Sequence, residues 1–207
     1  MPTKLFVELN KEKQQKIINA GIAEFAAHGY INSSTNTIVK NCGISKGSLF
    51  KYFANKEDLY FYILDIVTTE LVESLQGKAT SLSSELFQRV IEYSTLEFSW
   101  YIQNPEKSKL VISAFAKCDT EIYQKTVERY GMKEMDIYYK LLEDIDLSNF
   151  CWDRQKTIDI LKWVLKGFNE EFLESVQLDN ISFEDLRDEY VRRLREYLEV
   201  LKTGLLR

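Results

Sequence analysis

The sequence contains few residues that break helices, with two prolines and eight glycines among 207 residues. Turn-rich β folds use many more of them, because tight turns need their special backbone conformations. No strand-like alternation of apolar and polar residues, no internal repeat and no low-complexity segment is visible. Since 45% of the residues are hydrophobic and 13% aromatic, the chain can bury a core and is not disordered. We therefore expect an all-α fold, as one large domain or two small ones.

Cysteine is scarce as well, with Cys42, Cys118 and Cys151 widely spaced along the chain. Three distant cysteines form neither a disulfide framework nor a metal-binding pattern. We expect ordinary buried thiols in a reducing compartment, no metal site and no cofactor. The sequence also shows no E-x-x-H pair, no nucleophile elbow and no cysteine–histidine candidate. We therefore expect no enzyme, and a helical-bundle hydrolase or metal enzyme is the less favoured alternative.

Long hydrophobic runs are missing too. No apolar run approaches the roughly 18 residues that a membrane-spanning helix needs. The first residues, MPTKLFVELNKEKQQK, become charged too early for a signal peptide. We therefore expect a cytoplasmic protein without a membrane partner.

Positive charge is in the minority overall but gathers at the N-terminus. The net charge is −5, yet residues 1–56 carry eight lysines against three glutamates, a net of +5. Residues 57–207 carry 19 basic and 29 acidic side chains, a net of −10. A basic module on an acidic body is typical of a polyanion-binding domain joined to a body with another role. A solvated lysine face is the alternative that charge alone leaves open.

Helical periodicity and capping residues predict helices along nearly the whole chain. Asn10 begins the first, Ser34 or Thr35 begins the second, and Ser45 begins the third. A polar break at 77–84 indicates a subdomain boundary. The expected helices cover 10–28, 36–41, 46–53, 56 to beyond 71, 84–103, 105–117, 119–144, 154–176 and 183–202.

Two short helices joined by a tight turn at Gly43, after a longer helix, describe a helix-turn-helix unit. On a helical wheel of 46–53, Leu49 and Phe53 share one side, and we expect them to pack on the preceding helices. The other side carries a cation, a hydroxyl, aromatic edges and the bare backbone of Gly47. A glycine costs about 1 kcal/mol relative to alanine in a helix. The cost is explained if a DNA phosphate or base edge approaches the backbone there.

Three motifs in this part of the chain carry a resemblance. They are F-x-x-x-G-Y, then T-x-x-I, then G-[IV]-S-K-G-[ST]-[LF]-[FY]-x-[YH]-F-x-x-K-E-x-L. The matching residues are Phe25, Gly29, Tyr30, Thr35, Ile38, Gly43, Ile44, Ser45, Lys46, Gly47, Ser48, Leu49, Phe50, Tyr52, Phe53, Lys56, Glu57 and Leu59. Over about residues 11–64 the chain resembles the DNA-binding domain of the TetR family of transcriptional repressors. A match this dense is more specific than a lone glycine motif.

The resemblance implies both an architecture and a mechanism. The expected domains are a three-helix helix-turn-helix DNA-binding domain at 1–56, a connecting helix at 57–76, and a helical ligand-binding and dimerisation domain at 77–207. A homodimer would place its paired recognition helices in successive major grooves of a near-palindromic operator. A small-molecule inducer of unknown identity, bound in the body, would lower operator affinity. The alternative is an architectural or activator protein with the same DNA-binding head but no inducer.

The resemblance also implies the DNA-contacting side chains. Threonine and tyrosine hydroxyls would bind phosphate, and Lys56 would offer phosphate both its ammonium and a helix N-terminus. Lys46 and Ser48 would reach base edges, and Lys51 occupies a variable position that contributes to specificity. Phe50 stands where the family often has tyrosine, so one hydroxyl contact is absent. Its ring could still contact a thymine methyl. The full set is Thr35, Thr37, Ser45, Lys46, Gly47, Ser48, Phe50, Lys51, Tyr52 and Lys56.

A candidate ligand site lies in the expected helix at 84–103. Apolar walls with a few polar groups suit a small-molecule pocket, although aromatic residues at helical spacing usually form core. Glu97 lies inside the apolar sector. Its carboxylate either contacts a cationic, partly aromatic inducer or forms an internal salt bridge to a base such as Arg129. The candidate ligand-binding residues are Ser94, Glu97, Phe98, Trp100, Tyr101 and Phe115.

The last two expected helices present two apolar faces, and two faces need two partners. One partner is the domain's own core, and the other is the same pair of helices from a second chain. Gly167 would let another helix approach closely. A monomeric body with a thicker core is the alternative. The candidate dimer residues are Ile160, Trp163, Gly167, Tyr190, Leu194 and Tyr197.

Overall fold

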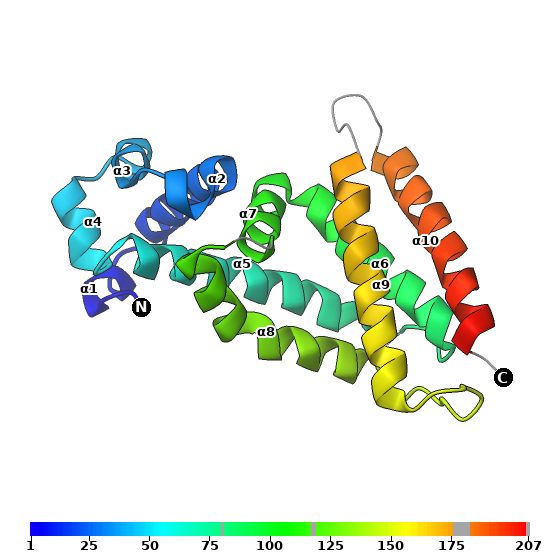
Figure 1. The fold of residues 1–207 in the computed structure, drawn as a ribbon. Helices are drawn as coiled ribbons and strands as arrows, with labels where there is room; N and C mark the ends of the chain where they lie inside the picture. The colour runs from blue at the N-terminus through cyan, green and yellow to red at the C-terminus, as the bar shows by residue number, and fades with distance from the viewer. Residues whose placement is uncertain (80, 117–118, 176–182, 206–207) are drawn as a thin grey trace. The chain divides into compact units, whose positions relative to one another are not determined.

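The computed structural model describes residues 1–79, 81–116, 119–175 and 183–205 (Figure 1). Over these ranges it contains ten α-helices and no strand, which confirms the all-α prediction. None of the helices in the described ranges is both long and apolar enough to cross a bilayer. The helices are α1 (Lys4–Val7), α2 (Lys11–Asn32), α3 (Thr35–Cys42), α4 (Lys46–Tyr52), α5 (Lys56–Ala79), α6 (Leu86–Gln103), α7 (Pro105–Phe115), α8 (Glu121–Leu142), α9 (Arg154–Ser175) and α10 (Phe183–Leu205).

The helices group into two compact units. The N-terminal unit comprises Met1–Ser74 and Gln103–Arg129, and the C-terminal unit comprises Leu75–Ile102 and Tyr130–Arg207. Helix α7 joins the N-terminal unit because it packs along α2. The functional division at residues 56 and 76 remains a prediction.

Three local features differ from the helices expected from sequence. Helix α1 was not predicted. Gly29, with a φ of 62°, kinks α2 instead of ending it, and the helix resumes to Asn32. Helix α5 continues through Gly77 to Ala79, so the polar break begins later than expected. The structure therefore has one more helix than expected, and two helices extend past a glycine. Intrinsic helix propensity predicts helix ends only weakly, because tertiary packing overrides it.

The cysteines also depart partly from expectation. Cys42 is half-buried, and burial raises the pKa of its thiol. Cys151 is exposed, so the prediction that it is buried was wrong. Cys118 lies outside the described residues.

An aromatic cluster holds the N-terminal unit together around the end of α4. Phe53 is fully buried, as predicted, and its ring centroid lies 4.8 Å from that of Phe6. Leu49 is also buried as predicted. Helix α1 is fastened to α4 by Thr3, whose N–H donates to the carbonyl of Tyr52 and whose hydroxyl donates to that of Lys51, both at 2.8 Å. The N-terminal segment therefore fixes the C-terminal end of α4.

In the C-terminal unit, α6, α9 and α10 share a second aromatic core. Phe98 stacks on Tyr190 with ring centroids 4.2 Å apart, and Phe172 meets both rings edge-on. The Tyr190 hydroxyl donates to the Asn169 side chain at 2.8 Å. Leu194 is fully buried beside this core. Tyr190 and Leu194 were expected at a dimer surface, but they face this core because their stripe of α10 is the inward one.

Candidate nucleic-acid interface

The turn between α3 and α4 has the geometry that the sequence predicts. Gly43 adopts a left-handed conformation, with φ 70° and ψ 33°, that side chains rarely tolerate. The next N–H, that of Ile44, returns to the carbonyl of Val39 at 3.0 Å. Ser45 then caps α4, because its hydroxyl accepts the Ser48 N–H at 3.0 Å. The two short helices are thus fixed by local backbone chemistry.

The start of α3 is fixed by a residue that sequence reasoning missed. Ser34 occupies the N-cap position, but its side chain makes no capping bond. Its N–H instead donates to the carboxylate of Glu24 in α2 at 2.7 Å, and Glu24 is buried. The signal in the sequence was an acidic residue on the apolar face of the first long helix. Glu24 therefore positions Thr35, the first residue of α3.

Helix α4 presents its outward side to solvent with little to neutralise its charge. Ser45, Lys46, Gly47, Phe50 and Lys51 are exposed, and Thr35, Thr37, Ser48, Tyr52 and Lys56 are half-buried. Residues 25–56 contain no aspartate or glutamate. Among the described residues, neither Lys46 nor Lys51 has an ion-pair partner. Both ammonium groups are therefore available to a polyanion.

Gly47 has no internal reason to be a glycine. It lies in the first turn of α4, and its φ is not in the left-handed range. A Cβ added there would meet only the Ser45 hydroxyl, at an ordinary contact distance of 3.9 Å. The chain therefore tolerates a side chain at this position. The open space beside the Gly47 backbone faces outward from the protein.

The predicted role of Lys56 needs correction. Its ammonium lies 2.7 Å from the carbonyl oxygen of Tyr30, 3.3 Å from that of Ile31 and 3.1 Å from that of Ser33. It also lies 4.5 Å from the centroid of the Tyr30 ring. An ammonium has three N–H donors, so the Lys56 side chain is fully occupied at the end of α2. What remains for phosphate is the N-terminus of α5, where the Asp58 N–H is already bonded to the Asn55 side chain at 2.7 Å and the two preceding N–H groups have no intrahelical acceptor.

Tyr52, predicted to bind phosphate, is held at both its ring and its backbone. Its ring packs edge-on against Phe6, with centroids 6.0 Å apart, and its backbone carbonyl is held by Thr3. Within the described part of the chain, its hydroxyl has no hydrogen-bond partner. The α1 segment therefore orients a hydroxyl that is free to bind a phosphate. Sequence reasoning missed Thr3 and Phe6 because nothing local predicts where a four-residue helix docks.

The candidate ligand residues fall into different environments. Ser94, Phe98 and Trp100 are buried, while Glu97 and Tyr101 are half-buried in the C-terminal unit. The remaining candidate, Phe115, belongs to α7 of the N-terminal unit.

Glu97 lies among phenols. The Tyr101 hydroxyl donates to its carboxylate at 3.2 Å. Burial, followed by the charge of Glu97, raises the pKa of Tyr93. Arg129, proposed as an internal partner of Glu97, pairs with Asp65 of α5. Whether Glu97 contacts a ligand remains a prediction.

Large apolar side chains are exposed on α9 and α10, and two of them were predicted at the dimer surface. Trp163 is 72% exposed and Tyr197 47% exposed, and Val200 adds a further exposed apolar side chain. A Cβ at Gly167 would meet nothing within 4 Å. Ile160 is half-buried.

The comparisons with known proteins agree with this geometry. Residues 17–63 match the profile of the family described as bacterial regulatory proteins, tetR family. The uncharacterized HTH-type transcriptional regulator YuxN of Bacillus subtilis is 29% identical over 140 residues, which cover 64% of this chain and 48% of YuxN. The probable acrEF/envCD operon repressor of Escherichia coli K12 is 26% identical over 107 residues, which cover 51% of this chain and 48% of the repressor. The chain thus spans about half the length of these curated relatives.

Solved structures share the fold over nearly the whole chain. A TetR family transcriptional regulator from Chloroflexus aurantiacus has a TM-score of 0.70 at 22% identity, and the match covers 100% of this chain and 99% of that one. The regulator FadR of Bacillus subtilis, in complex with stearoyl-CoA, has a TM-score of 0.63 at 16% identity, and the match covers 87% of this chain and 96% of FadR. These relatives are described as transcriptional regulators. With its helix-turn-helix geometry, the segment 17–63 is thus similar to the DNA-binding domain of the tetR family of bacterial regulatory proteins, and the whole chain shares the fold of TetR family regulators.

Proposed function

We propose that the protein is a transcriptional repressor that binds a near-palindromic operator as a homodimer and is released from it by a small molecule. The observation that carries the proposal is the outward side of α4, where Lys46 and Lys51 are exposed and unpaired beside Gly47. A basic helix surface without acidic neighbours attracts phosphate, and a bare backbone allows close approach.

The arrangement supports a division of work between phosphate and base contacts. The Tyr52 hydroxyl, the threonine hydroxyls at the start of α3 and the N-terminus of α5 would hold the phosphate backbone. Lys46, in the first turn of α4, would reach the edges of bases, for which guanine is the preferred partner of a lysine. The hydroxyls of Ser45 and Ser48 lie 2.9 Å apart, and one donates to the other. The hydroxyl that accepts keeps its own proton, which can be donated to an acceptor on DNA.

The exposed apolar side chains of α9 and α10 support dimerisation. Trp163, Tyr197 and Val200 are large apolar side chains that a second copy would cover, and Gly167 offers a close approach between helices. A two-fold dimer would present two α4 helices to half-sites whose centres are about one helical turn apart, or a multiple of it. We place this activity in the cytoplasm, where bacterial DNA lies.

Release by a small molecule is supported by a relative. FadR of Bacillus subtilis was solved with stearoyl-CoA, so this fold accommodates a ligand in at least one member. A ligand that binds the DNA-free conformation more tightly lowers operator affinity by the same coupling free energy. A regulator with the same DNA-binding domain and no inducer remains the alternative.

Selection of duplexes from a random pool tests the DNA-binding proposal. We expect an inverted repeat, and we expect Lys46→Ala to weaken binding and to flatten the preference at one position by about 1–3 kcal/mol. Lys109→Ala, which removes an exposed lysine from α7, is the control and should leave the selected sequence unchanged. Identical selected sequences for wild type and Lys46→Ala would exclude base reading by Lys46. A reporter whose transcription rises when the protein is present would favour an activator over a repressor.

A further inference from the structure

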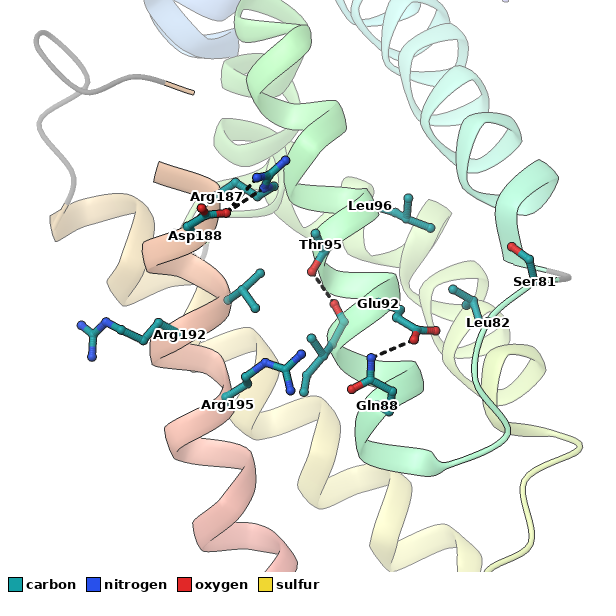
Figure 2. Close-up of a pocket in the computed structure, with 12 residues that line it drawn as sticks. Ser81, Leu82, Gln88, Glu92, Thr95, Leu96, Arg187, Asp188, Arg192 and Arg195 are labelled. Carbon is teal, nitrogen blue, oxygen red and sulfur yellow. Dashed lines mark hydrogen bonds and ion pairs between the residues drawn. The ribbon is translucent and has the colours of Figure 1, made fainter. Parts of the chain in front are cut away.

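The C-terminal unit carries an open groove of about 820 Å³ between α6 and α10 (Figure 2). Its volume lies within the roughly 300–1,000 Å³ of small-molecule sites. Four apolar side chains line it: Leu82, Ile91, Leu96 and Val191. All lining residues belong to the C-terminal unit. None of them was among the ligand-binding residues expected from the sequence.

Most of the polar groups that α6 contributes to the groove are already hydrogen-bonded within the chain. The Thr95 hydroxyl donates to the carbonyl of Ile91 at 2.6 Å. The Glu92 carboxylate accepts the Gln88 amide and the Ser83 N–H, each at 2.8 Å. These hydrogen bonds, that of Gln88 first, lower the pKa of Glu92 and keep it negatively charged. Within the described residues, helix α6 therefore offers the groove one fixed negative charge and the second N–H of the Gln88 amide.

Helix α10 contributes three arginines, and two of them are neutralised on their own helix. Arg187 pairs with Asp188 at 2.9 Å. Arg192 pairs with glutamates one turn away on either side, at 2.7 and 2.6 Å, and its side chain points away from the groove (Figure 2).

Arg195 differs from both. Its side chain extends across the groove toward α6 (Figure 2). Within the described residues it has no ion-pair or hydrogen-bond partner. The groove thus combines one unpaired guanidinium with an apolar wall.

We propose that this groove binds a long-chain carboxylate, with its head group on Arg195 and its hydrocarbon chain along Val191, Ile91 and Leu96. A guanidinium binds a carboxylate through two parallel N–H···O bonds, which fixes the head group in one orientation. One free cation matches one anionic charge. A polyanion such as an acyl-CoA is disfavoured, because its phosphates would meet Glu92 and Asp188 without further cations to pair with.

Isothermal titration of the full chain with dodecanoate, below its micelle concentration, tests the proposal. We expect saturable binding that Arg195→Gln weakens at least tenfold. Arg192→Gln is the matched control, because it removes an arginine three residues away that is paired and points outward, and it should bind as wild type does. Arg195→Glu should reverse the preference, so that dodecyltrimethylammonium, which has the same chain and the opposite charge, binds more tightly than dodecanoate.

Several results would overturn the assignment. They are no binding of dodecanoate at millimolar concentration, unchanged binding by Arg195→Gln, equal wild-type affinity for dodecyltrimethylammonium, and tighter binding of dodecanoyl-CoA than of dodecanoate. Since Arg195 is exposed, its variants should melt at the wild-type temperature. The Arg195→Glu test compares two ligands on the same protein, so a difference in stability between variants does not affect it. The titration contains no DNA, so a negative result would exclude the carboxylate site without bearing on the proposed repressor function.

Discussion

Replacing Gly47 by alanine should make the protein more stable and a weaker binder of DNA. The backbone at this position is helical, and the added Cβ would meet only the Ser45 hydroxyl at 3.9 Å. Alanine restricts the unfolded chain more than glycine does, so the free energy of unfolding should rise by roughly 0.5–1 kcal/mol. For a chain of this length that is a rise in melting temperature of about 1–4 °C.

The same Cβ would occupy the space through which DNA approaches α4. We expect the dissociation constant for a selected operator, measured by fluorescence anisotropy, to rise about tenfold, which is about 1.4 kcal/mol. Gly204→Ala is the control, because Gly204 also lies in a helix, and an added Cβ there would meet nothing within 4 Å. It should raise stability slightly and leave operator affinity unchanged.

The opposite signs make the experiment decisive, since loss of DNA binding cannot then be attributed to unfolding. A Gly47→Ala protein that is more stable and binds as tightly as wild type would show that no close approach occurs at α4. A less stable protein would show that Gly47 has an internal role.

Three further substitutions test other parts of the account. Gly167→Arg should give a folded monomer with weakened operator binding, because its Cβ points into open space and one head makes half of the operator contacts; an unaltered dimer in sedimentation would place the interface elsewhere. Glu97→Gln should lower the melting temperature and leave release by cationic and neutral aromatic compounds unchanged, because Tyr101 already supplies an internal partner; loss of the response to cations in a stable protein would instead make Glu97 a ligand contact. Lys56→Met should lower stability by about 1–3 kcal/mol in chemical denaturation, because three carbonyls lose a charged donor; an unchanged midpoint would refute that role.

Local chemistry explains why much of the fold was predictable. Gly43 marks a left-handed turn because it has no side chain, and Ser45 marks a helix start because its hydroxyl caps the first turn. Both features occur where predicted. Helix α1 escaped prediction because four residues have too little periodicity, and its position depends on Thr3 and Phe6 finding partners far along the chain. Such partners are set by tertiary packing and leave no local pattern.

The candidate sites show the same limit. On α10, Tyr190 and Tyr197 lie seven residues apart in one apolar stripe, yet Tyr190 is buried and Tyr197 is 47% exposed. Periodicity identifies an apolar face without saying which partner covers it. The motif likewise identified Lys56, but its three carbonyl acceptors come from the end of α2, and only the folded chain brings them together.

The salt dependence of operator affinity is the strictest test of DNA binding through α4. Each phosphate contact that a lysine neutralises should add roughly 0.9 to the slope of log K against log salt. Because Lys46 and Lys51 are exposed and unpaired, the wild-type protein should show a steep negative slope, and a Lys46→Ala, Lys51→Ala double variant a shallower one. Lys109→Ala should keep the wild-type slope. An affinity for duplex DNA that does not change with salt, or a double variant with the wild-type slope, would contradict DNA binding through α4.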